Sequence, residues 1–433
     1  MIRPTPEWAL LELASGPEDL IDLGLQRVAA VASRLGLDRT DAKVLTVAGT
    51  NGKGSSVAFS EAILTKLGVA VGAYTSPHIL KFNERIRING TPVSDQDILE
   101  ALSAIKCVLE DTVLTYFEIA TIAALYIFKS YQLDVLVLEV GLGGRLDAVN
   151  ILDPDVSLIT SIDIDHVAWL GSDRESIGKE KAGILRPGRP AVIADPFPPK
   201  SIGEQNPDSH FFCYKHEWNV LEEEADRHFI ELLIQRSCAT EKRYRFLCPN
   251  GILPVNVGAS VQALSLMGFE PSGAQMSEIA DEFVLIGRLQ SFLLDGYEIL
   301  VDVAHNPSAV SVLQKYIEVN VVGGKNYAIF AALQDKDIVN MLTGLCDVFA
   351  AWFIADLPDA ARGANSDDIQ RIITQLGGNE PTKWPTVKDA WDRACELMIP
   401  GDRLVVFGSF YTISAVLPLI QSMRDGTKCE QLG

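Results

Sequence analysis

The residues best placed to do chemistry lie in the segment GTNGKGSS around Lys53. Its glycines let backbone N–H groups approach a polyphosphate, the lysine can reach the terminal phosphates, and Ser55 or Ser56 can hold Mg²⁺. The segment departs from the common pattern G-x-x-x-x-G-K-[ST], because Val47 stands at the first glycine and Gly54 separates the lysine from the hydroxyl. A nucleotide triphosphate site is the favoured interpretation, and an ordinary glycine-rich βα turn is the alternative.

Carboxylates and a histidine follow two apolar segments further along the chain. Glu139 comes near the end of DVLVLEV, a nearly continuous apolar run of the kind that is buried on both faces of a parallel sheet. A charge there is costly unless it is paired or bound to a metal, so we favour metal or magnesium-water binding over a structural salt bridge. Asp163, Asp165 and His166 follow the predicted strand 156–160, and a structural role for the histidine is equally open.

Three other polar side chains have more than one interpretation. Ser76 follows a predicted strand at 69–74 and is a candidate metal or phosphate contact, although by itself it would more often form the turn before Pro77. Arg85 and Arg87 alternate with isoleucines and share one face of a short predicted strand. We expect these arginines either to meet an anion or to be solvated.

The elements that must position these groups alternate between strands and helices. Apolar and β-branched residues at 44–47 predict a strand before the glycine-rich segment, and helical spacing follows it, so the positive end of a helix would face the phosphates. Helical spacing also covers 20–37, which we interpret as an amphipathic helix. Lys179 and Lys181 lie close together in ESIGKEKAGI, where two solvated lysines are the ordinary interpretation.

The composition excludes several classes of function. The chain has 37 Lys and Arg against 57 Asp and Glu, a formal charge of −20, which argues against a general nucleic-acid or anionic-membrane surface. The 7 cysteines are scattered without C-x-x-C spacing and indicate reduced thiols. The N-terminus lacks the apolar core of a signal peptide, and the longest apolar run, 119–128, is too short to span a bilayer. We therefore expect a cytoplasmic protein.

The length of 433 residues exceeds one compact core, and the patterning predicts an α/β protein with two domains. Residues 1–284 are assigned to a P-loop-type domain with a parallel sheet and a small antiparallel excursion in the weakly patterned stretch 195–254. Residues 285–297 form the predicted interdomain linker, and residues 298–433 form a smaller Rossmann-like α/β domain. Strands of this second domain are expected at 299–304, 327–332, 351–355 and 403–407.

Several segments together resemble one family. In chain order they are GTNGKGSS, TSPHILKFNERIRING, TYFE, LEVGLGGRLDAVN, TSIDIDHVAWLG, IGKEKAGI, GRLQ, DVAHNP, DKD, ARGA and GSF. Their order and spacing resemble those of bacterial folylpolyglutamate synthase/dihydrofolate synthase, a member of the Mur ligase superfamily. The resemblance covers nearly the whole chain and is weakest between residues 195 and 255.

The resemblance implies an ATP-dependent amide ligase with ATP and Mg²⁺ as cofactors, and with a monovalent cation such as K⁺ as a further candidate. In this family, ATP phosphorylates the carboxylate of dihydropteroate or the γ-carboxylate of a reduced folate, and the amine of L-glutamate then displaces phosphate. The implied partners are therefore small molecules, and the family suggests a monomer. A ligase with only one of the two acceptors, a Mur-type ligase for another carboxylate, and a catalytically impaired nucleotide-binding relative are the alternatives.

The resemblance also implies a set of site residues. The catalytic set is Lys53, Glu139, His166 and Lys181. The nucleotide-binding set is Thr50, Asn51, Gly52, Lys53, Gly54, Ser55, Arg288, Asp302 and His305. The pterin-binding set is Leu20, Ile21, Asp22, Leu23, Thr115, Tyr116, Phe117, Glu118 and Leu146. The metal-binding set is Ser76, Glu139, His166 and Lys181, the last of these once it is carbamylated to a carboxylate.

One segment departs from the family. Where the family commonly has an asparagine near the nucleotide, in a P-x-P-N-A-A type segment, this chain reads PVNVGA from Pro254 onward. Gly258 takes the place of the asparagine unless Asn256 is shifted into it. This departure affects one expected contact with the adenine of the nucleotide. The residues that the resemblance implies for phosphate and metal binding are all present.

Overall fold

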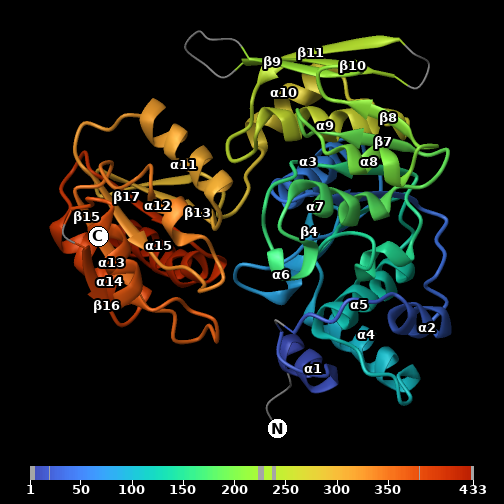
Figure 1. Cartoon of the computed structure of the whole chain (residues 1–433), viewed down its shortest axis with the longest axis horizontal. Coiled ribbons are helices and arrows are strands. Elements are labelled where there is room, and N and C mark those ends of the chain that lie inside the picture. The colour runs from blue at the N-terminus through green and yellow to red at the C-terminus, as the bar shows by residue number, and fades with distance from the viewer. Residues whose placement is uncertain (1–4, 19, 223–228, 237–239, 380, 431–433) are drawn as a thin grey trace. The chain divides into compact units, whose positions relative to one another are not determined.

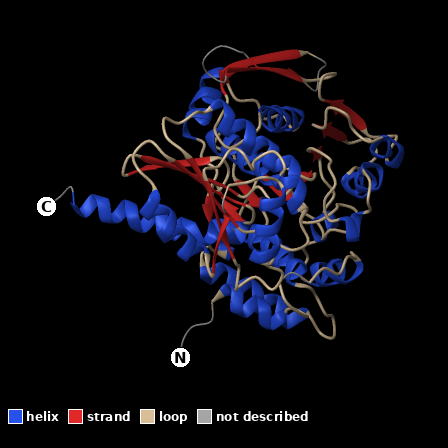
Figure 2. Ribbon diagram, turned by 60° about the vertical axis from the view of Figure 1, so that its left-hand side comes forward, coloured by secondary structure: helices blue, strands red, loops and turns tan. Residues whose placement is uncertain are grey.

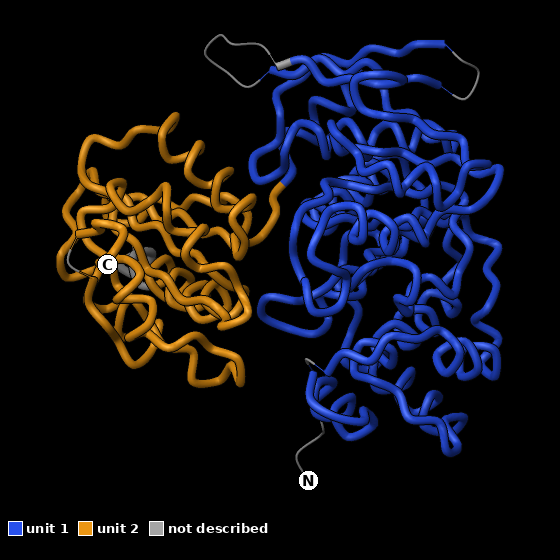
Figure 3. The backbone as a smooth tube through the Cα atoms, viewed as in Figure 1, with its two compact units in different colours: residues 1–283 blue, residues 284–433 orange. Residues whose placement is uncertain are grey.

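The computed structural model describes residues 5–18, 20–222, 229–236, 240–379 and 381–430. The chain forms two compact units, Met1–Phe283 and Val284–Gly433, which Figure 3 distinguishes by colour. Residues 290–294, within the segment that we predict as a linker, form a strand of the second unit.

An eight-stranded sheet forms the centre of the first unit. In spatial order its strands are β4 (Thr91–Pro92), β3 (Ile86–Ile88), β2 (Val71–Tyr74), β5 (Val135–Glu139), β1 (Lys43–Ala48), β6 (Val156–Ile159), β7 (Pro190–Ile193) and β8 (His210–Cys213). The six strands from β2 to β8 in this order run parallel, and β3 and β4 are antiparallel additions at one edge. The segments that follow β2, β5, β1 and β6 therefore emerge side by side at one end of the sheet, where open α/β sheets bind ligands.

Helices cover both faces of this sheet because each buries an apolar stripe against the strands. One hydrophobic core joins the sheet to α3, α9 and α10, and another joins it to α1, α2, α4 and α5. The helices of the first unit are α1 (Pro6–Leu13), α2 (Gln26–Arg34), α3 (Lys53–Lys66), α4 (Asp95–Val108), α5 (Tyr116–Ser130), α6 (Val167–Leu170), α7 (Arg174–Lys181), α8 (Lys200–Gln205), α9 (Pro254–Leu266) and α10 (Gly273–Glu282). Short 3₁₀ turns are η1 (Phe82–Arg85), η2 (Ala148–Ile151) and η3 (Ala182–Ile184).

A three-stranded antiparallel sheet packs on α9 and α10, and Figure 1 shows it at the top of the first unit. Its strands are β9 (Asn219–Glu222), β10 (Phe229–Gln235) and β11 (Glu241–Leu247). Alternate residues of β10 are buried, which is the period expected when one face of a sheet meets a core. This sheet is the antiparallel excursion that the sequence predicts.

The second unit contains a six-stranded sheet in which only the edge strand β12 is antiparallel. Its strands in spatial order are β12 (Gln290–Leu294), β13 (Tyr297–Asp302), β17 (Arg403–Phe407), β14 (Asn326–Phe330), β15 (Ala351–Ala355) and β16 (Pro381–Trp384). The helices are α11 (Pro307–Val319), α12 (Ile338–Leu342), α13 (Ser366–Gln375), α14 (Val387–Leu397) and α15 (Phe410–Glu430), and Figure 2 shows α15 as the long helix that leads to the C-terminus.

The predicted fold class is confirmed: a parallel-dominated α/β unit precedes a second α/β unit. The predicted helix at 20–37 is wrong in length, because only Gln26–Arg34 is helical. The carbonyl of Asp22 accepts a hydrogen bond from the guanidinium of Arg27, which holds the preceding residues outside the helix. Among the residues that the structure describes, none of the helices combines the length and apolar character that a bilayer crossing requires.

Candidate active site

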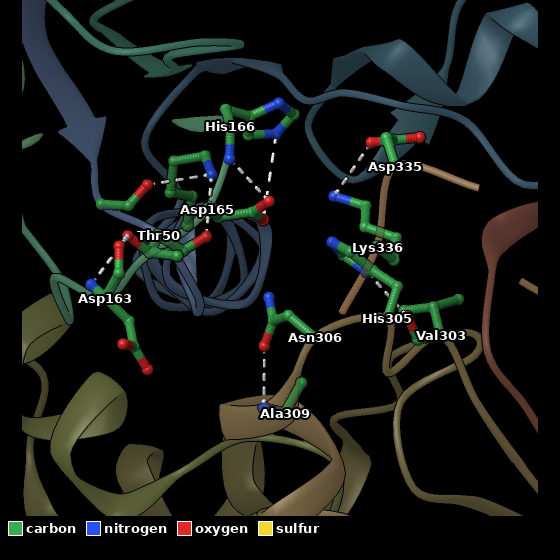
Figure 4. Close-up of polar contacts among 12 residues, drawn as sticks. Thr50, Asp163, Asp165, His166, Val303, His305, Asn306, Ala309, Asp335 and Lys336 are labelled. Atoms are coloured by element: carbon green, nitrogen blue, oxygen red, sulfur yellow. Dashed lines mark hydrogen bonds and ion pairs between the residues drawn. The ribbon is translucent and has the colours of Figure 1, made fainter. Parts of the chain in front are cut away.

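The glycine-rich loop connects the end of β1 to the start of α3. Gly49 has φ 148°, and a Cβ there would lie 1.7 Å from the Thr160 hydroxyl oxygen, so only glycine fits. The hydroxyl of Thr50 donates to the Asp163 carbonyl and accepts from the Asp163 N–H, each over 3.0 Å (Figure 4). The loop is thereby fastened to the segment that follows β6, and the N-terminal end of α3 is left to face a ligand.

Two lysines meet at the backbone of this loop. The Nζ of Lys53 donates to the carbonyl oxygens of Gly49 and Thr50, over 3.1 and 3.2 Å, and the Nζ of Lys181 donates to the Gly49 carbonyl over 2.6 Å. Lys181 is only 4% exposed, so the solvated interpretation is wrong for this residue. Burial, and then the charge of Lys53, lower the pKa of Lys181 well below its usual value. The charges of Asp165 and Asp147 act in the opposite direction but do not outweigh the burial.

Glu139 is buried at the end of β5, against the same loop. One oxygen of its carboxylate accepts a hydrogen bond from the Ser76 N–H over 3.1 Å, and that oxygen lies 3.3 Å from the point where a Cβ on Gly54 would stand. Two members of the predicted metal set are therefore adjacent, and they lie beside the start of α3. Mg²⁺ is usually held by one or two carboxylates together with substrate phosphates, and these residues fit that pattern.

His166 follows β6 in a left-handed conformation, with φ 52°. Its N–H donates to an Asp165 carboxylate oxygen over 2.8 Å, and its Nε2 lies 3.9 Å from the other oxygen (Figure 4). Over the described ranges, three or more His, Cys, Asp or Glu side chains do not gather as a preformed metal cluster. A cation here would thus depend on phosphate oxygens for part of its coordination.

Asp147 is a candidate active-site residue that the sequence did not lead us to predict. Its side chain is 2% exposed and accepts hydrogen bonds from the N–H groups of Leu142 and Val149, over 2.8 and 3.0 Å. Burial raises its pKa to about 7, while these backbone donors and the charge of Lys53 act in the opposite direction. Its position directly after Leu146 in the glycine-rich GLGGRLD segment was the available signal.

The predicted pterin-binding residues come together around the N-terminus of α5. Thr115 and Glu118 form a reciprocal capping box there. Arg27 links this box to the loop before α2, because its Nε donates to Glu118 over 2.9 Å and its Nη1 lies 2.6 Å from the Asp22 carboxylate. The neighbours of Asp22 in the predicted set, Leu20, Ile21 and Leu23, lie in this same loop.

Two aromatic residues in the first turn of α5, Tyr116 and Phe117, belong to the same predicted pterin-binding set. The Phe117 ring lies 2.5 Å from the point where a Cβ on Gly141 would stand, so the glycine after β5 gives the ring room. The Tyr116 ring lies 5.3 Å from the Arg85 guanidinium. Leu146 is half-buried in the glycine-rich segment that begins at Gly141.

The solvated interpretation of Arg85 and Arg87 is wrong. The Arg85 side chain is 4% exposed, and its Nη2 lies 2.5 Å from a Glu18 carboxylate oxygen. The Arg87 side chain is 16% exposed and pairs with Glu61. The anion that each arginine meets is a carboxylate of the chain itself.

Asn256, rather than Gly258, lies against the phosphate loop. A Cβ on Gly52 would stand 2.3 Å from the Asn256 side-chain nitrogen, whereas a Cβ on Gly258 would stand 2.9 Å from the Trp218 ring. Counted from the first proline of the motif, the asparagine of the family falls on Val257, one residue before Gly258. The side-chain amide that reaches the loop therefore comes from one position earlier in the helix.

In the second unit, three predicted residues form what we call the Phe410 group: Arg288 and His305 lie beside the Phe410 ring, and the charge of Arg288 acts on Asp302. Both oxygens of the buried Asp302 carboxylate accept backbone N–H bonds, over 2.7 and 2.8 Å. Burial raises the pKa of Asp302, while the charge of Arg288 and these backbone donors lower it. The Arg288 guanidinium lies 5.7 Å and the His305 ring 5.9 Å from the centre of the Phe410 ring. Figure 4 shows the His305 Nδ1 at the Val303 carbonyl, 2.9 Å away.

The second unit also carries a recognisable family pattern. The family described as Mur ligase, glutamate ligase domain matches residues 287–410. This match, together with the lysine-bearing phosphate loop of the first unit, defines a ligase of the Mur class, whose members use ATP.

Comparison over the full length is more specific. The dihydrofolate synthase/folylpolyglutamate synthase of Escherichia coli strain K12 is 37% identical, over 99% of this chain and 100% of that protein. The structure of E. coli FolC in complex with DHPP and ADP has a TM-score of 0.88 at 36% identity, and covers 98% of this chain and 99% of its own. A Yersinia pestis structure of the bifunctional enzyme, complexed with AMPPNP and a Mn ion, has a TM-score of 0.87 at 35% identity, over 97% and 98% of the two chains. The chain belongs to the dihydrofolate synthase/folylpolyglutamate synthase family.

Proposed function

We propose that this chain adds L-glutamate to dihydropteroate, and to the γ-carboxylate of reduced folates, through an acyl phosphate formed from ATP. The observation that carries the proposal is the meeting of Lys53 and Lys181 at the Gly49 carbonyl, at a loop that also faces the Glu139 carboxylate. The Lys53 amine lies where the phosphates of a nucleotide would bind, and the family supplies the identity of the acceptors.

The chemistry requires that a poor electrophile be activated. A carboxylate oxygen of the acceptor attacks the γ-phosphorus of ATP, so that a P–O bond to it forms as the bond to ADP breaks. The glutamate amine then attacks the acyl carbon, phosphate leaves with the electron pair of the C–O bond, and the nitrogen loses a proton. Lys53 and the N–H groups of the loop would stabilise the charge on the phosphates. A divalent cation would neutralise further phosphate charge, and Ser76 and Glu139 are the residues that would hold it.

Lys181 has a second proposed role. Its buried amine is favoured in the neutral form, which is the form that reacts with CO₂. In that reaction a bond forms between Nζ and the carbon of CO₂ as one C–O π bond opens onto oxygen, and the nitrogen loses one proton, so a neutral amine becomes an anionic carbamate. The new carboxylate would add negative charge beside the loop and would give a cation an oxygen ligand.

The remaining site residues are assigned to a ligand separately for the first and the second unit. We assign residues 50–55 and Asn256 to the nucleotide phosphates, and the group around Arg27 and the N-terminus of α5 to the pterin. Arg288, Asp302 and His305 are assigned to the nucleotide from the second unit.

We also propose that the enzyme is a cytoplasmic monomer. The five cysteines whose side chains the structure describes form no disulfide bond, as expected for a reducing compartment. Cys238 lies outside the described residues, and the side chain of Cys429 is not described either. Light scattering after size-exclusion chromatography would test the monomer, and a mass near twice 47.2 kDa would contradict it.

The decisive experiment measures ADP release by the purified chain with ATP, Mg²⁺ and L-glutamate, once with dihydropteroate and once with a tetrahydrofolate. Product mass must rise by one glutamyl residue in each reaction. Turnover with both acceptors is the expected result, and turnover with one would restrict the proposal to that acceptor. Turnover with neither, in protein that still binds ATP, would contradict the proposal and favour a nucleotide-binding relative without catalysis.

A further inference from the structure

The first unit contains a buried ion pair that the proposed chemistry does not use. The Nε of Arg87 donates to a carboxylate oxygen of Glu61 over 2.8 Å, and the two side chains are 16% and 6% exposed. Charges so far from solvent persist only when they are paired and hydrogen-bonded. The other Glu61 oxygen accepts the Gly90 N–H over 3.0 Å, so the carboxylate has a partner on each side.

The pair joins two segments of the candidate active site. Glu61 lies on α3, the helix that begins at Lys53 directly after the phosphate loop. The Nη1 of Arg87 donates to the hydroxyl of Thr75 over 2.9 Å and to the Glu84 carbonyl over 2.8 Å. One guanidinium therefore connects the phosphate-loop helix with the end of β2.

The residue after Thr75 is the proposed metal ligand Ser76. Its N–H donates to the Glu139 carboxylate, which is the other proposed ligand from this end of the sheet. Any displacement of Thr75 relative to α3 would move both the serine hydroxyl and this hydrogen bond. The position of Ser76 is thus tied to the phosphate loop through Arg87 and Glu61.

We propose that Arg87 is a positioning residue, which fixes the distance between the phosphate-loop helix and the Ser76 segment and so prepares the place where a divalent cation meets the nucleotide. The inference rests on the metal site of the proposed function. Arginine suits the role because its planar fork can serve one carboxylate and two further acceptors at fixed angles, which a lysine ammonium on a flexible chain cannot do. Partners that orient metal ligands typically affect metal affinity when they are removed.

A purely structural ion pair would behave differently. Its loss would lower the stability of the unit and leave the affinity for a cation unchanged. Arg403 provides a matched control, because it is a buried arginine of the second unit whose Nε donates to Glu298 over 2.7 Å. Arg403→Lys should reduce stability without changing metal binding.

The test measures Mn²⁺ binding to the full-length chain in the presence of ADP, by electron paramagnetic resonance of free Mn²⁺, for Arg87→Lys, Arg87→Met and Arg403→Lys. Both Arg87 variants should bind Mn²⁺ roughly 10- to 100-fold more weakly than the parent chain. Their affinity for ADP without metal should change by less than about threefold, and Arg403→Lys should match the parent. Unchanged Mn²⁺ affinity in the Arg87 variants would overturn the inference.

Arg87→Met alone leaves Glu61 as an unpaired buried charge and could fail to fold. The double variant Glu61→Leu/Arg87→Met removes both charges, a replacement that is often neutral for stability. It should be as stable as the parent and still bind Mn²⁺ weakly, and normal Mn²⁺ binding in the folded double variant would overturn the inference.

These measurements separate the inference from the proposed function, because Mn²⁺ binding requires no turnover. A parent chain that transfers glutamate while its Arg87 variants bind Mn²⁺ normally would overturn the inference alone. A parent chain without transfer, whose Mn²⁺ affinity still falls in the Arg87 variants, would support the inference and contradict the proposed function.

Discussion

The phosphate loop of the first unit and the Phe410 group of the second unit are both built at strand ends, but their charges are satisfied in opposite ways. At the loop, the Nζ atoms of Lys53 and Lys181 both donate to one backbone carbonyl, that of Gly49. In the second unit, the buried charge is Asp302, whose two oxygens already accept backbone N–H bonds beside Arg288. The loop therefore brings two amine side chains to one neutral acceptor, whereas the second unit holds a buried carboxylate between backbone donors and a guanidinium.

This difference suggests a division of work. A lysine ammonium that faces the bound phosphates can stabilise charge that develops during phosphoryl transfer. Groups that are already paired provide a fixed surface, which contributes equally to the ground state and the transition state. Substitutions at the loop should therefore reduce turnover, and substitutions in the Phe410 group should raise the KM for the nucleotide.

The largest effect should come from Lys53→Ala. Because this lysine is the cation proposed to face the terminal phosphates, its loss should reduce kcat about 10³-fold with either acceptor. Steady-state ADP release would measure the change. Lys66→Ala is the matched control, since it removes a lysine from the far end of α3, where it pairs with Glu278. A Lys53→Ala chain that retains a tenth of the parental kcat would contradict our assignment of the loop.

Lys181→Arg should have the next largest effect, with a loss of about 10²-fold in kcat. Arginine stays charged and cannot form a carbamate, so it would add a cation where the proposal needs an anion. Lys179→Arg, at an exposed position two residues earlier on α7, is the control. ¹³C NMR of the parent chain under ¹³CO₂ should show a carbamate signal that is missing from Lys181→Arg. A fully active Lys181→Arg chain would remove this residue from the chemistry.

In the second unit, Asp302→Asn should raise the KM for ATP about tenfold and change kcat less. Asparagine has one acceptor oxygen and one donor NH₂ group, so one of the two backbone N–H groups would face another donor and one of the two anchoring bonds is lost. Kinetics at varied ATP would separate the two parameters, and Asp295→Asn in an exposed turn is the control. If kcat instead fell as far as in Lys53→Ala, it would contradict the hypothesis that the loop controls turnover and the Phe410 group controls the KM for the nucleotide.

The smallest effect is expected for Phe410→Leu. The ring supports both Arg288 and His305, and exposed cation–π contacts are worth about 0.5–1 kcal/mol, so the KM for ATP should rise roughly two- to fivefold. Phe410→Tyr retains the ring and should match the parent. A parental KM for Phe410→Leu would show that the ring does not position either neighbour.

Elements with strong apolar patterns were predictable from the sequence. The continuous run that forms β5 and the capping residues that begin α4 and α5 each indicate their structure locally. Strand β16 has the sequence PTKW, which lacks apolar alternation, and it forms because β15 offers a free edge. A local pattern cannot report such a partner.

Some residues of the candidate site could likewise be predicted from local sequence, and others could not. Its glycines, Lys53 and Glu139 are conspicuous by residue type and by their place after strands. The partner of Arg87 could not be predicted, because Glu61 lies on a different element and the arginine could equally have faced solvent. The predicted common strand for Arg85 and Arg87 is wrong, because Arg85 ends the 3₁₀ turn η1 and only Arg87 lies on β3. The contact between Asn256 and Gly52 likewise joins residues that are far apart along the chain. For such residues, tertiary packing decides the role.

The buried Asp147 has a consequence for the heat of binding. A carboxyl group with a pKa of about 7 carries its proton in roughly half of the molecules at pH 7. The charge of Lys53 lowers that pKa, and a phosphate drawn to the same lysine would weaken this influence, so the protein should take up a fraction of a proton as ADP binds without metal. Titration calorimetry with ADP in buffers of different ionisation enthalpy would register the uptake as a buffer-dependent enthalpy. Nucleotide affinity in the absence of metal would accordingly rise as the solution is made mildly acidic.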